Sequence, residues 1–193
     1  MAQHHHALTA AATEGNTGAV AALLSGVESI SKAKCISALI AAAQHGHTEC
    51  VRVLMAVVDP KERDSMALVK AAEHGHVDTV QLLLPVSHPK SSESMALQMA
   101  ARNGHLACVQ ALIGVSDAKA HHSKALMETA RSGHTDTLAF LLPHSNPRAL
   151  GGWALVGAAA GGHKECVKML LPHCDATEGN SAALQVALEG KHE

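Results

Sequence analysis

Apolar residues between positions 65 and 75 follow the spacing of a short helix. They fall at i, i+1, i+4 and i+5, which places them on one face of an α-helix, and they are Ala67, Leu68, Ala71 and Ala72. Ser65 precedes this stripe and is a residue type that caps helices at their start. Gly75 follows it and can end the helix in a left-handed conformation. The pattern therefore predicts one short amphipathic helix.

A second apolar stripe follows directly after Gly75. It consists of Val80, Leu83 and Leu84, and Pro85 ends it because proline cannot continue a helix. The segment 85–94, PVSHPKSSES, is rich in proline, serine and charge and has no alternation of apolar and polar residues, so it predicts a loop rather than a strand. The whole pattern predicts a unit of helix, tight turn, helix and loop.

The same pattern returns along the chain at a fixed interval. From Gly46 onward the turn glycines follow a constant 29-residue step, and only the first interval is longer, by two positions; they are Gly15, Gly46, Gly75, Gly104, Gly133 and Gly162. The Ala-Leu pairs keep the same step and begin near residues 7, 38, 67, 96, 125, 154 and 183. A period between about 20 and 50 residues is typical of a solenoid, in which each unit buries its apolar face on its neighbours. We therefore expect six full units and a C-terminal partial unit.

The repeated motifs ALxxAAxxGH and VxxLL resemble the ankyrin repeat, whose pattern is TPLHxAAxxGHxxxVxxLL. The resemblance extends from Ala7 to about Leu188. It implies an all-α fold, an α-solenoid of stacked helix-turn-helix repeats that forms a single domain over residues 1–193. The 29-residue period is shorter than the usual period of about 33, and SxAL replaces TPLH. We therefore expect the β-hairpin between units to be shortened or absent. Other helical solenoids are the alternative.

The resemblance also implies a function, because ankyrin arrays bind other proteins and carry no catalytic chemistry. In this family the two residues before the Gly-His pair face the concave surface, and here they vary in charge and size while the flanking Ala and Gly are constant. The partner-binding residues expected on this basis are Gln44, His45, Glu73, His74, Arg102, Asn103, Arg131 and Ser132. The alternative is that these side chains form only a solvated surface.

The few residues that carry most of the binding energy of a protein interface are enriched in tryptophan, tyrosine and arginine. Arg102, Arg131 and Trp153 are therefore the expected anchors for a partner, particularly as Trp153 and Phe140 are the only aromatic residues in the chain. Trp153 has a second explanation, because it stands where earlier units have a methionine and can simply pack near the C-terminal end.

Composition excludes several classes of partner. The formal net charge is −2 and the isoelectric point is about 6.8, so the chain has no charge excess that would attract nucleic acid or an anionic membrane. The longest apolar runs are far shorter than the roughly 20 residues of a transmembrane helix, and the N-terminus lacks the pattern of a secretory signal. We expect an intracellular protein, with the cytoplasm as its compartment.

The 16 histidines invite a metal hypothesis, which the spacing of the units opposes. Equivalent residues of neighbouring units lie roughly 10 Å apart, whereas the ligand nitrogens of one zinc ion lie only about 2 Å from the metal. We therefore expect no metal site and assign a structural role at the turn, bonding backbone groups, to His47, His76, His105, His134 and His163.

The cysteines follow the repeat as well. Cys50, Cys108 and Cys166 occupy the same position in every second unit, and Thr79 and Thr137 occupy it in the units between them. This alternation is typical of a small packing position, and the separation by two units is too large for a disulfide bond. We expect thiols in a reducing compartment.

Two functions remain open. The chain is either a non-catalytic protein-protein interaction scaffold, which binds through the concave helix face and the loops between repeats, or a structural subunit of a larger assembly or homo-oligomer. An enzyme is not expected, because the chain has no phosphate-binding loop, no HExxH and no CxxC motif; no cofactor is expected either. Unit one and the segment 189–193 have the polar character of solenoid caps, so we expect a complete domain, with a fragment of a longer array as the alternative.

Overall fold

The computed structural model describes residues 2–26 and 30–174 of the 193-residue chain. Contacts within the chain form two compact units, residues 1–92 and 93–193. The predicted partial unit near residue 183 and the predicted cap at 189–193 lie outside the described residues.

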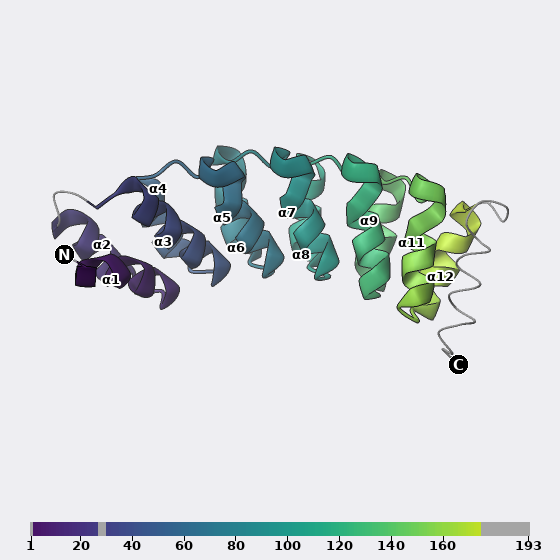
Figure 1. The fold of residues 1–193 in the computed structure, drawn as a ribbon, viewed down its shortest axis with the longest axis horizontal. Coiled ribbons are helices and arrows are strands. Elements are labelled where there is room, and N and C mark those ends of the chain that lie inside the picture. The colour runs from purple at the N-terminus through teal and green to yellow at the C-terminus, as the bar shows by residue number, and fades with distance from the viewer. Residues whose placement is uncertain (1, 27–29, 175–193) are drawn as a thin grey trace. The chain divides into compact units, whose positions relative to one another are not determined.

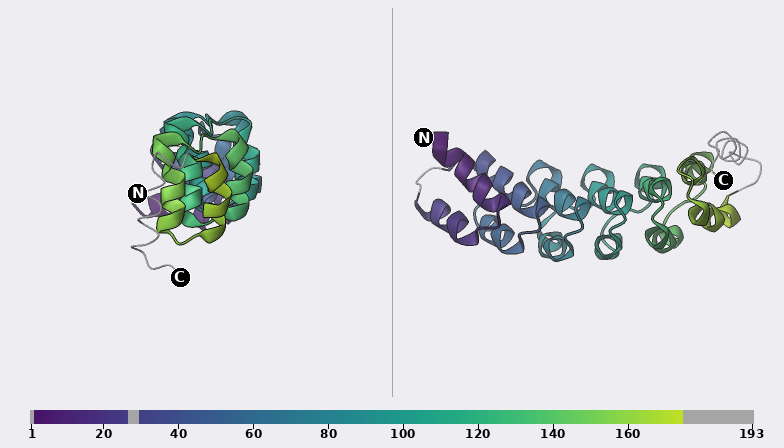
Figure 2. Two further views of the ribbon diagram at one scale, coloured as in Figure 1. Left: turned by 90° about the vertical axis from the view of Figure 1, so that its right-hand side faces the viewer. Right: turned by 90° about the horizontal axis from the view of Figure 1, so that it is seen from below.

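The first unit consists of helix pairs stacked in two layers. The first helices of the pairs, α1, α3 and α5, pack side by side in one layer, and the second helices, α2, α4 and α6, form the other (Figures 1 and 2). The helices of this unit are α1 (Ala2–Thr13), α2 (Thr17–Gly26), α3 (Lys32–Gln44), α4 (Thr48–Met55), α5 (Glu62–Glu73), α6 (Val77–Leu83) and the 3₁₀ turn η1 (Leu84–Val86).

The second unit repeats this arrangement. Helix α9 packs beside α11 in one layer, and α10 packs between α8 and α12 in the other. Its helices are α7 (Ser91–Arg102), which begins at the unit boundary, α8 (Leu106–Ile113), α9 (Ala120–Ser132), α10 (Thr135–Leu141), η2 (Leu142–His144), α11 (Ala149–Ala160), α12 (Lys164–Leu170) and η3 (Leu171–His173). Among the described residues none is in a strand. The predicted all-α fold of helix-turn-helix repeats without a β-hairpin is confirmed.

The core of each unit is made of alanine and leucine, as the apolar stripes predict. In α5 and α6 the residues Ala71, Ala72, Leu68, Val80 and Leu83 have no exposed surface. Because alanine has a single methyl group, the facing helices can approach to the short end of the usual interaxial range of about 8–10 Å. The small side chains thus explain how a chain almost without aromatic residues fills its interior.

A short left-handed turn lies at the start of four first helices, α5, α7, α9 and α11. Arg63, Asp64 and Ser65 have φ of 51°, 56° and 60°, and the same conformation recurs one period later at 92–94 and again at 121–123 and 150–152. Left-handed residues other than glycine cost roughly 1–2 kcal/mol each. The turn therefore reverses the chain in few residues at an energetic cost, and it takes the place of the missing hairpin.

The last residue of this turn joins neighbouring parts of the unit. The buried Ser65 hydroxyl accepts a hydrogen bond from the backbone N–H of His88 at 2.9 Å. Equivalent bonds reach Ser94 from Asp117 (2.9 Å) and Ser123 from Asn146 (2.8 Å). The prediction that Ser65 caps its own helix is wrong, because a capping serine has extended backbone angles whereas Ser65 is left-handed and bonds a later segment.

No helix in the described part of the chain has both the length and the apolar character needed to cross a membrane.

Candidate partner-binding face

The tight turn between the two helices of a pair depends on its glycine. Gly75 follows α5 with φ of 79°, in the left-handed region that glycine adopts without a Cβ clash, and α6 begins two residues later. The N–H groups of Gly75 and His76 bond the carbonyls of Ala72 and Ala71, which would otherwise have no partner at the helix end. The predicted helix end at Gly75 is confirmed.

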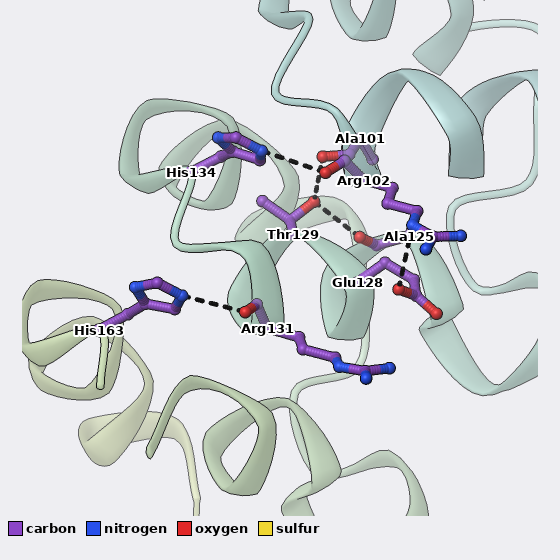
Figure 3. Close-up of polar contacts among 8 residues, drawn as sticks. All are labelled: Ala101, Arg102, Ala125, Glu128, Thr129, Arg131, His134 and His163. Carbon is purple, nitrogen blue, oxygen red and sulfur yellow. Dashed lines mark hydrogen bonds and ion pairs between the residues drawn. The ribbon is translucent and has the colours of Figure 1, made fainter. Parts of the chain in front are cut away.

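The histidine after this glycine binds the preceding repeat. His76 Nε2 donates a hydrogen bond to the Gln44 carbonyl at 2.9 Å, and Figure 3 shows two equivalent bonds in the second unit, from His134 to Arg102 (3.1 Å) and from His163 to Arg131 (3.0 Å). His47 makes the same bond to Thr13 in the first unit. The structural role predicted for His47, His76, His134 and His163 is confirmed, with the acceptor in the neighbouring repeat. The role of His105 stays a prediction.

The imidazole ring also occupies the space beside the preceding turn glycine. A Cβ atom added to Gly46 would lie 2.5 Å from His76 Nδ1, closer than real Cβ contacts allow. Glycine is therefore required at this position for two reasons, its left-handed backbone and the ring against it. These contacts fix the ends of α1, α3, α7 and α9, and so fix the direction in which the two residues before the glycine point.

Those two residues are accessible to solvent in every repeat for which they were predicted. Gln44 and Glu73 are half-buried, whereas the other predicted residues are exposed: His45, His74, Arg102, Asn103, Arg131 and Ser132. Their exposure makes contact with a partner possible.

In the first unit these side chains are already engaged with their own helix. Lys70 Nζ lies 2.6 Å from Glu73 Oε2, and the His74 ring bonds the Lys70 carbonyl at 3.0 Å. The His74 and His76 rings stack with centroids 6.3 Å apart. The opposite charges of Lys70 and Glu73 cancel, so this part of the surface has little net charge.

In the second unit the side chains extend further into solvent. Arg102, Glu128 and Arg131 extend to the same side of their helices, away from His134 and His163 (Figure 3). Arg102 Nε lies 3.9 Å from Glu128 Oε2, at the limit of an ion pair. Within the described residues the Arg131 guanidinium has no ion pair or hydrogen bond. A cation on this surface is therefore available to a ligand.

Trp153 lies on α11 and is 59% exposed. The alternative explanation, packing near the C-terminal end, involves residues 175–193, which lie outside the described residues. Trp153 is four residues before Gly157, which is one turn of helix, so both lie on one face of α11. A Cβ added to Gly157 would lie 3.3 Å from the Arg131 Cβ. The face of α11 that carries Trp153 is thus the face next to Arg131.

Sequence reasoning missed four further residues of this surface. Met95 and Met99 on α7, and Lys124 and Glu128 on α9, are half-buried and occupy the positions that Trp153 and Gly157 occupy on α11. The 29-residue register contains this signal, because residues 95 and 124 align with Trp153. We call the residues at three equivalent positions on α7, α9 and α11 the first-helix face: the position of Trp153, that of Gly157 and that of Arg131. Its members are Met95, Met99, Arg102, Lys124, Glu128, Arg131, Trp153, Gly157 and Ala160.

The cysteine position inside the repeats is fully buried. Cys50, Cys108 and Cys166 have no exposed surface, and none of the five cysteines, all of them in the described residues, forms a disulfide bond. Burial raises the pKa of Cys108 to about 11 and also raises that of Cys166, because a thiolate loses its hydration inside the protein. These thiols are therefore packing groups at neutral pH. Among the described residues no three His, Cys, Asp or Glu side chains are arranged to hold a metal ion.

Solved structures similar to this chain are ankyrin repeat domains. The human ASB11 ankyrin repeat domain has a TM-score of 0.74 and 19% identity, with coverage of 93% of this chain and 96% of that one. The ankyrin repeat domain of Bcl-3, described as a unique member of the IkappaB protein family, has a TM-score of 0.70 and 23% identity, with coverage of 94% and 93%. At this identity the likeness shows the fold. No curated protein sequence matches the chain.

The sequence itself matches the family model for ankyrin repeats (3 copies) over residues 8–93, 86–150 and 126–193. These segments cover nearly the whole chain, and they agree with the helix pairs, the Gly-His turns and the stacking described above. The chain belongs to the ankyrin repeat family.

Proposed function

We propose that this chain is a non-catalytic scaffold that binds a partner protein through the first-helix face and the adjacent loops. Ankyrin repeat domains generally mediate protein-protein interaction, and the two similar structures belong to that fold. The partner-binding role of the individual residues, including Gln44, His45, Glu73 and His74 of the first unit, is part of this proposal.

One observation supports it most. The first-helix face presents Trp153, 59% exposed, on the same side as Arg131, whose guanidinium has no ion pair or hydrogen bond in the described residues. Burial of an exposed tryptophan side chain in an interface is favourable by a few kcal/mol of hydrophobic free energy. Tryptophan and arginine are also among the residue types that most often anchor interfaces. A repeat array has no need of either residue at a solvated position.

Affinity capture with mass spectrometry tests the proposal. The wild-type chain is compared with a face variant, Arg102→Ala/Arg131→Ala/Trp153→Ala, and with a control variant that removes two lysines and one large apolar residue from the other layer of the same unit, Lys164→Ala/Lys168→Ala/Leu171→Ala. All three of these control residues are exposed, and Leu171 is 49% exposed. Circular dichroism confirms that both variants are folded.

We expect the wild-type chain and the control variant to capture the same partner, and the face variant to lose it. Equal capture by the face variant would place the interaction elsewhere and contradict the proposal. Sedimentation of the purified chain separates the second hypothesis, since a structural subunit would form a large particle of fixed size whereas a scaffold remains monomeric until its partner is added.

A further inference from the structure

The first-helix face of the second unit is positively charged although the whole chain is not. It carries three cations, Arg102, Lys124 and Arg131, and one carboxylate, Glu128, against a formal net charge of −2 for the chain. Within the described residues neither Lys124 nor Arg131 has an ion pair or a side-chain hydrogen bond, and Arg102 has only the long contact with Glu128. The positive charge of this surface is therefore not neutralised by its own neighbours.

The same surface is apolar between its charges. Met95 and Met99 are half-buried on α7, and Trp153 is exposed on α11. Methionine side chains adapt to differently shaped apolar partners. Gly157 and Ala160 add no bulk beyond a methyl group on α11, so Trp153 is the one large side chain that α11 contributes to this surface. The large apolar side chains of this surface thus lie on α7 and α11, and the cations lie on α7 and α9.

The size of the surface sets the length of a matching ligand. Neighbouring helices lie about 10 Å apart, so the distance from α7 to α11 is roughly 20 Å. An extended peptide rises about 3.3 Å per residue, and six or seven residues are therefore enough to cross all three helices. Successive side chains of an extended peptide point to opposite sides, so every second side chain of such a peptide can contact the face.

We propose that the first-helix face of the second unit recognises an acidic peptide segment that carries at least one large apolar side chain. The carboxylates of the segment pair with Arg102, Lys124 and Arg131, and its apolar side chain packs against Trp153. This inference rests on the proposed function and adds the chemistry of the partner. A nucleic acid fits less well, because the surface has a net charge of only +2 and one aromatic residue, whereas nucleic-acid sites combine extended positive charge with stacking aromatic residues.

A peptide library displayed on phage tests the inference on the full chain. Random peptides of about 12 residues are long enough to cross the face with flanking residues, and they are selected on the immobilised wild-type chain. Selected sequences are then synthesised with a fluorophore, and their dissociation constants are measured by anisotropy. The test variants are Arg131→Glu and Trp153→Ala, and their matched controls in the other layer are Lys168→Glu and Leu171→Ala.

We expect selected peptides to have net negative charge and a Leu, Phe, Met or Trp residue. Binding should weaken at least about tenfold in each test variant, as for an interface anchor, and by less than about twofold in the controls. Raising the salt concentration from about 0.1 to 0.5 M should weaken it further, because salt screens exposed charges.

Three results would overturn the inference. They are the selection of neutral or basic peptides, acidic peptides that bind Arg131→Glu as tightly as wild type, and a library from which no peptide is recovered. In each case the face variant can still fail to capture the partner protein, and then the proposed function stands without this partner chemistry. A single-stranded oligonucleotide of about 12 nucleotides that binds tightly and depends on Arg131 would assign the face to nucleic acid instead.

Discussion

At the scale of single residues, His76 shows how one side chain connects two repeats. Its Nε2 atom donates to the carbonyl of Gln44, and its ring fills the space beside Gly46. The carbonyl belongs to the last turn of α3, where backbone acceptors have no partner within the helix. A single imidazole thus satisfies a helix end, excludes any larger residue at the glycine and fixes the distance between two helix pairs.

Replacing His76 with Ala should therefore destabilise the protein. The loss combines a hydrogen bond to a partly buried carbonyl with the contacts of the ring, and we expect a decrease of about 1–3 kcal/mol in the free energy of unfolding. Urea titration followed by circular dichroism measures it. His88→Ala is the matched control, because His88 is exposed and contributes only its backbone N–H; this variant should change stability by less than about 0.5 kcal/mol. Equal changes in the free energy of unfolding for the two variants would contradict a stabilising role of the His76 ring.

The structural role of this histidine could be predicted from the sequence, but its partner could not. The repeated Gly-His pair and the spacing of the units excluded a shared metal ion. The acceptor lies in the preceding repeat, on a helix whose position follows only from the stacking. For Met95 and Lys124 the 29-residue register gives the alignment with Trp153, but the exposure of this side of the helices follows only from the stacking.

At the scale of elements, the left-handed turn is the device that shortens this repeat. A hairpin would add about four residues to each unit, to reach the usual period of about 33. Instead, three consecutive residues with positive φ, such as His121, His122 and Ser123, lead directly into the next first helix. Their strain is offset in part by the partly buried hydrogen bond that Ser123 accepts from the backbone N–H of Asn146.

Two substitutions one period apart test the strain in opposite directions. His122 has φ of 57° and is exposed, so His122→Gly should stabilise the protein by about 1 kcal/mol, because glycine adopts this conformation without a Cβ clash. Gly151 is the equivalent residue with φ of 68°, and no atom lies within 4 Å of an added Cβ. Gly151→Ala should therefore destabilise by a similar amount through the backbone alone. Urea denaturation measures both, and changes of the same sign would show that the turn is not strained.

The missing hairpin was predictable and the turn that replaces it was not. The short period leaves no room for a hairpin between the second helix of one pair and the first helix of the next, and this can be read directly from the sequence. The residues Arg63, Asp64 and Ser65 give no sign of left-handed backbone, since Ser65 has the same identity that a helix cap would have. Only the last copy, Leu150-Gly151-Gly152, has the glycines that would have suggested it.

At the scale of the whole molecule, the single domain over residues 1–193 stays a prediction. The 29-residue period continues without interruption from Gly75 to Gly104, across the boundary between the two compact units. Repeat arrays gain their stability from interfaces between neighbours, which couples the unfolding of adjacent repeats. An unbroken period therefore favours unfolding as one cooperative element.

The only tryptophan allows this to be measured. Trp153 lies in the second unit, so its fluorescence reports that unit alone, whereas far-ultraviolet circular dichroism reports all helices. We expect the two urea transitions to coincide, as they do for a cooperative two-state transition. A fluorescence midpoint that differs from the circular dichroism midpoint, or a dichroism curve with two steps, would mean that the units unfold independently.

Two recurring kinds of hydrogen bond between repeats also give the array a polarity. The later segment supplies the donor whether an imidazole reaches back to a carbonyl, as in His163 to Arg131, or a backbone N–H reaches back to a serine, as in Asn146 to Ser123. Deleting repeats from the carboxyl side of a unit would uncover acceptors, and deleting them from the amino side would leave donors without acceptors. A designed extension of this chain can therefore grow at either side as long as the order of donor and acceptor is kept. A copy added after a repeat brings donors to oxygen atoms that are already there, and a copy added before one brings oxygen atoms to donors that are already there.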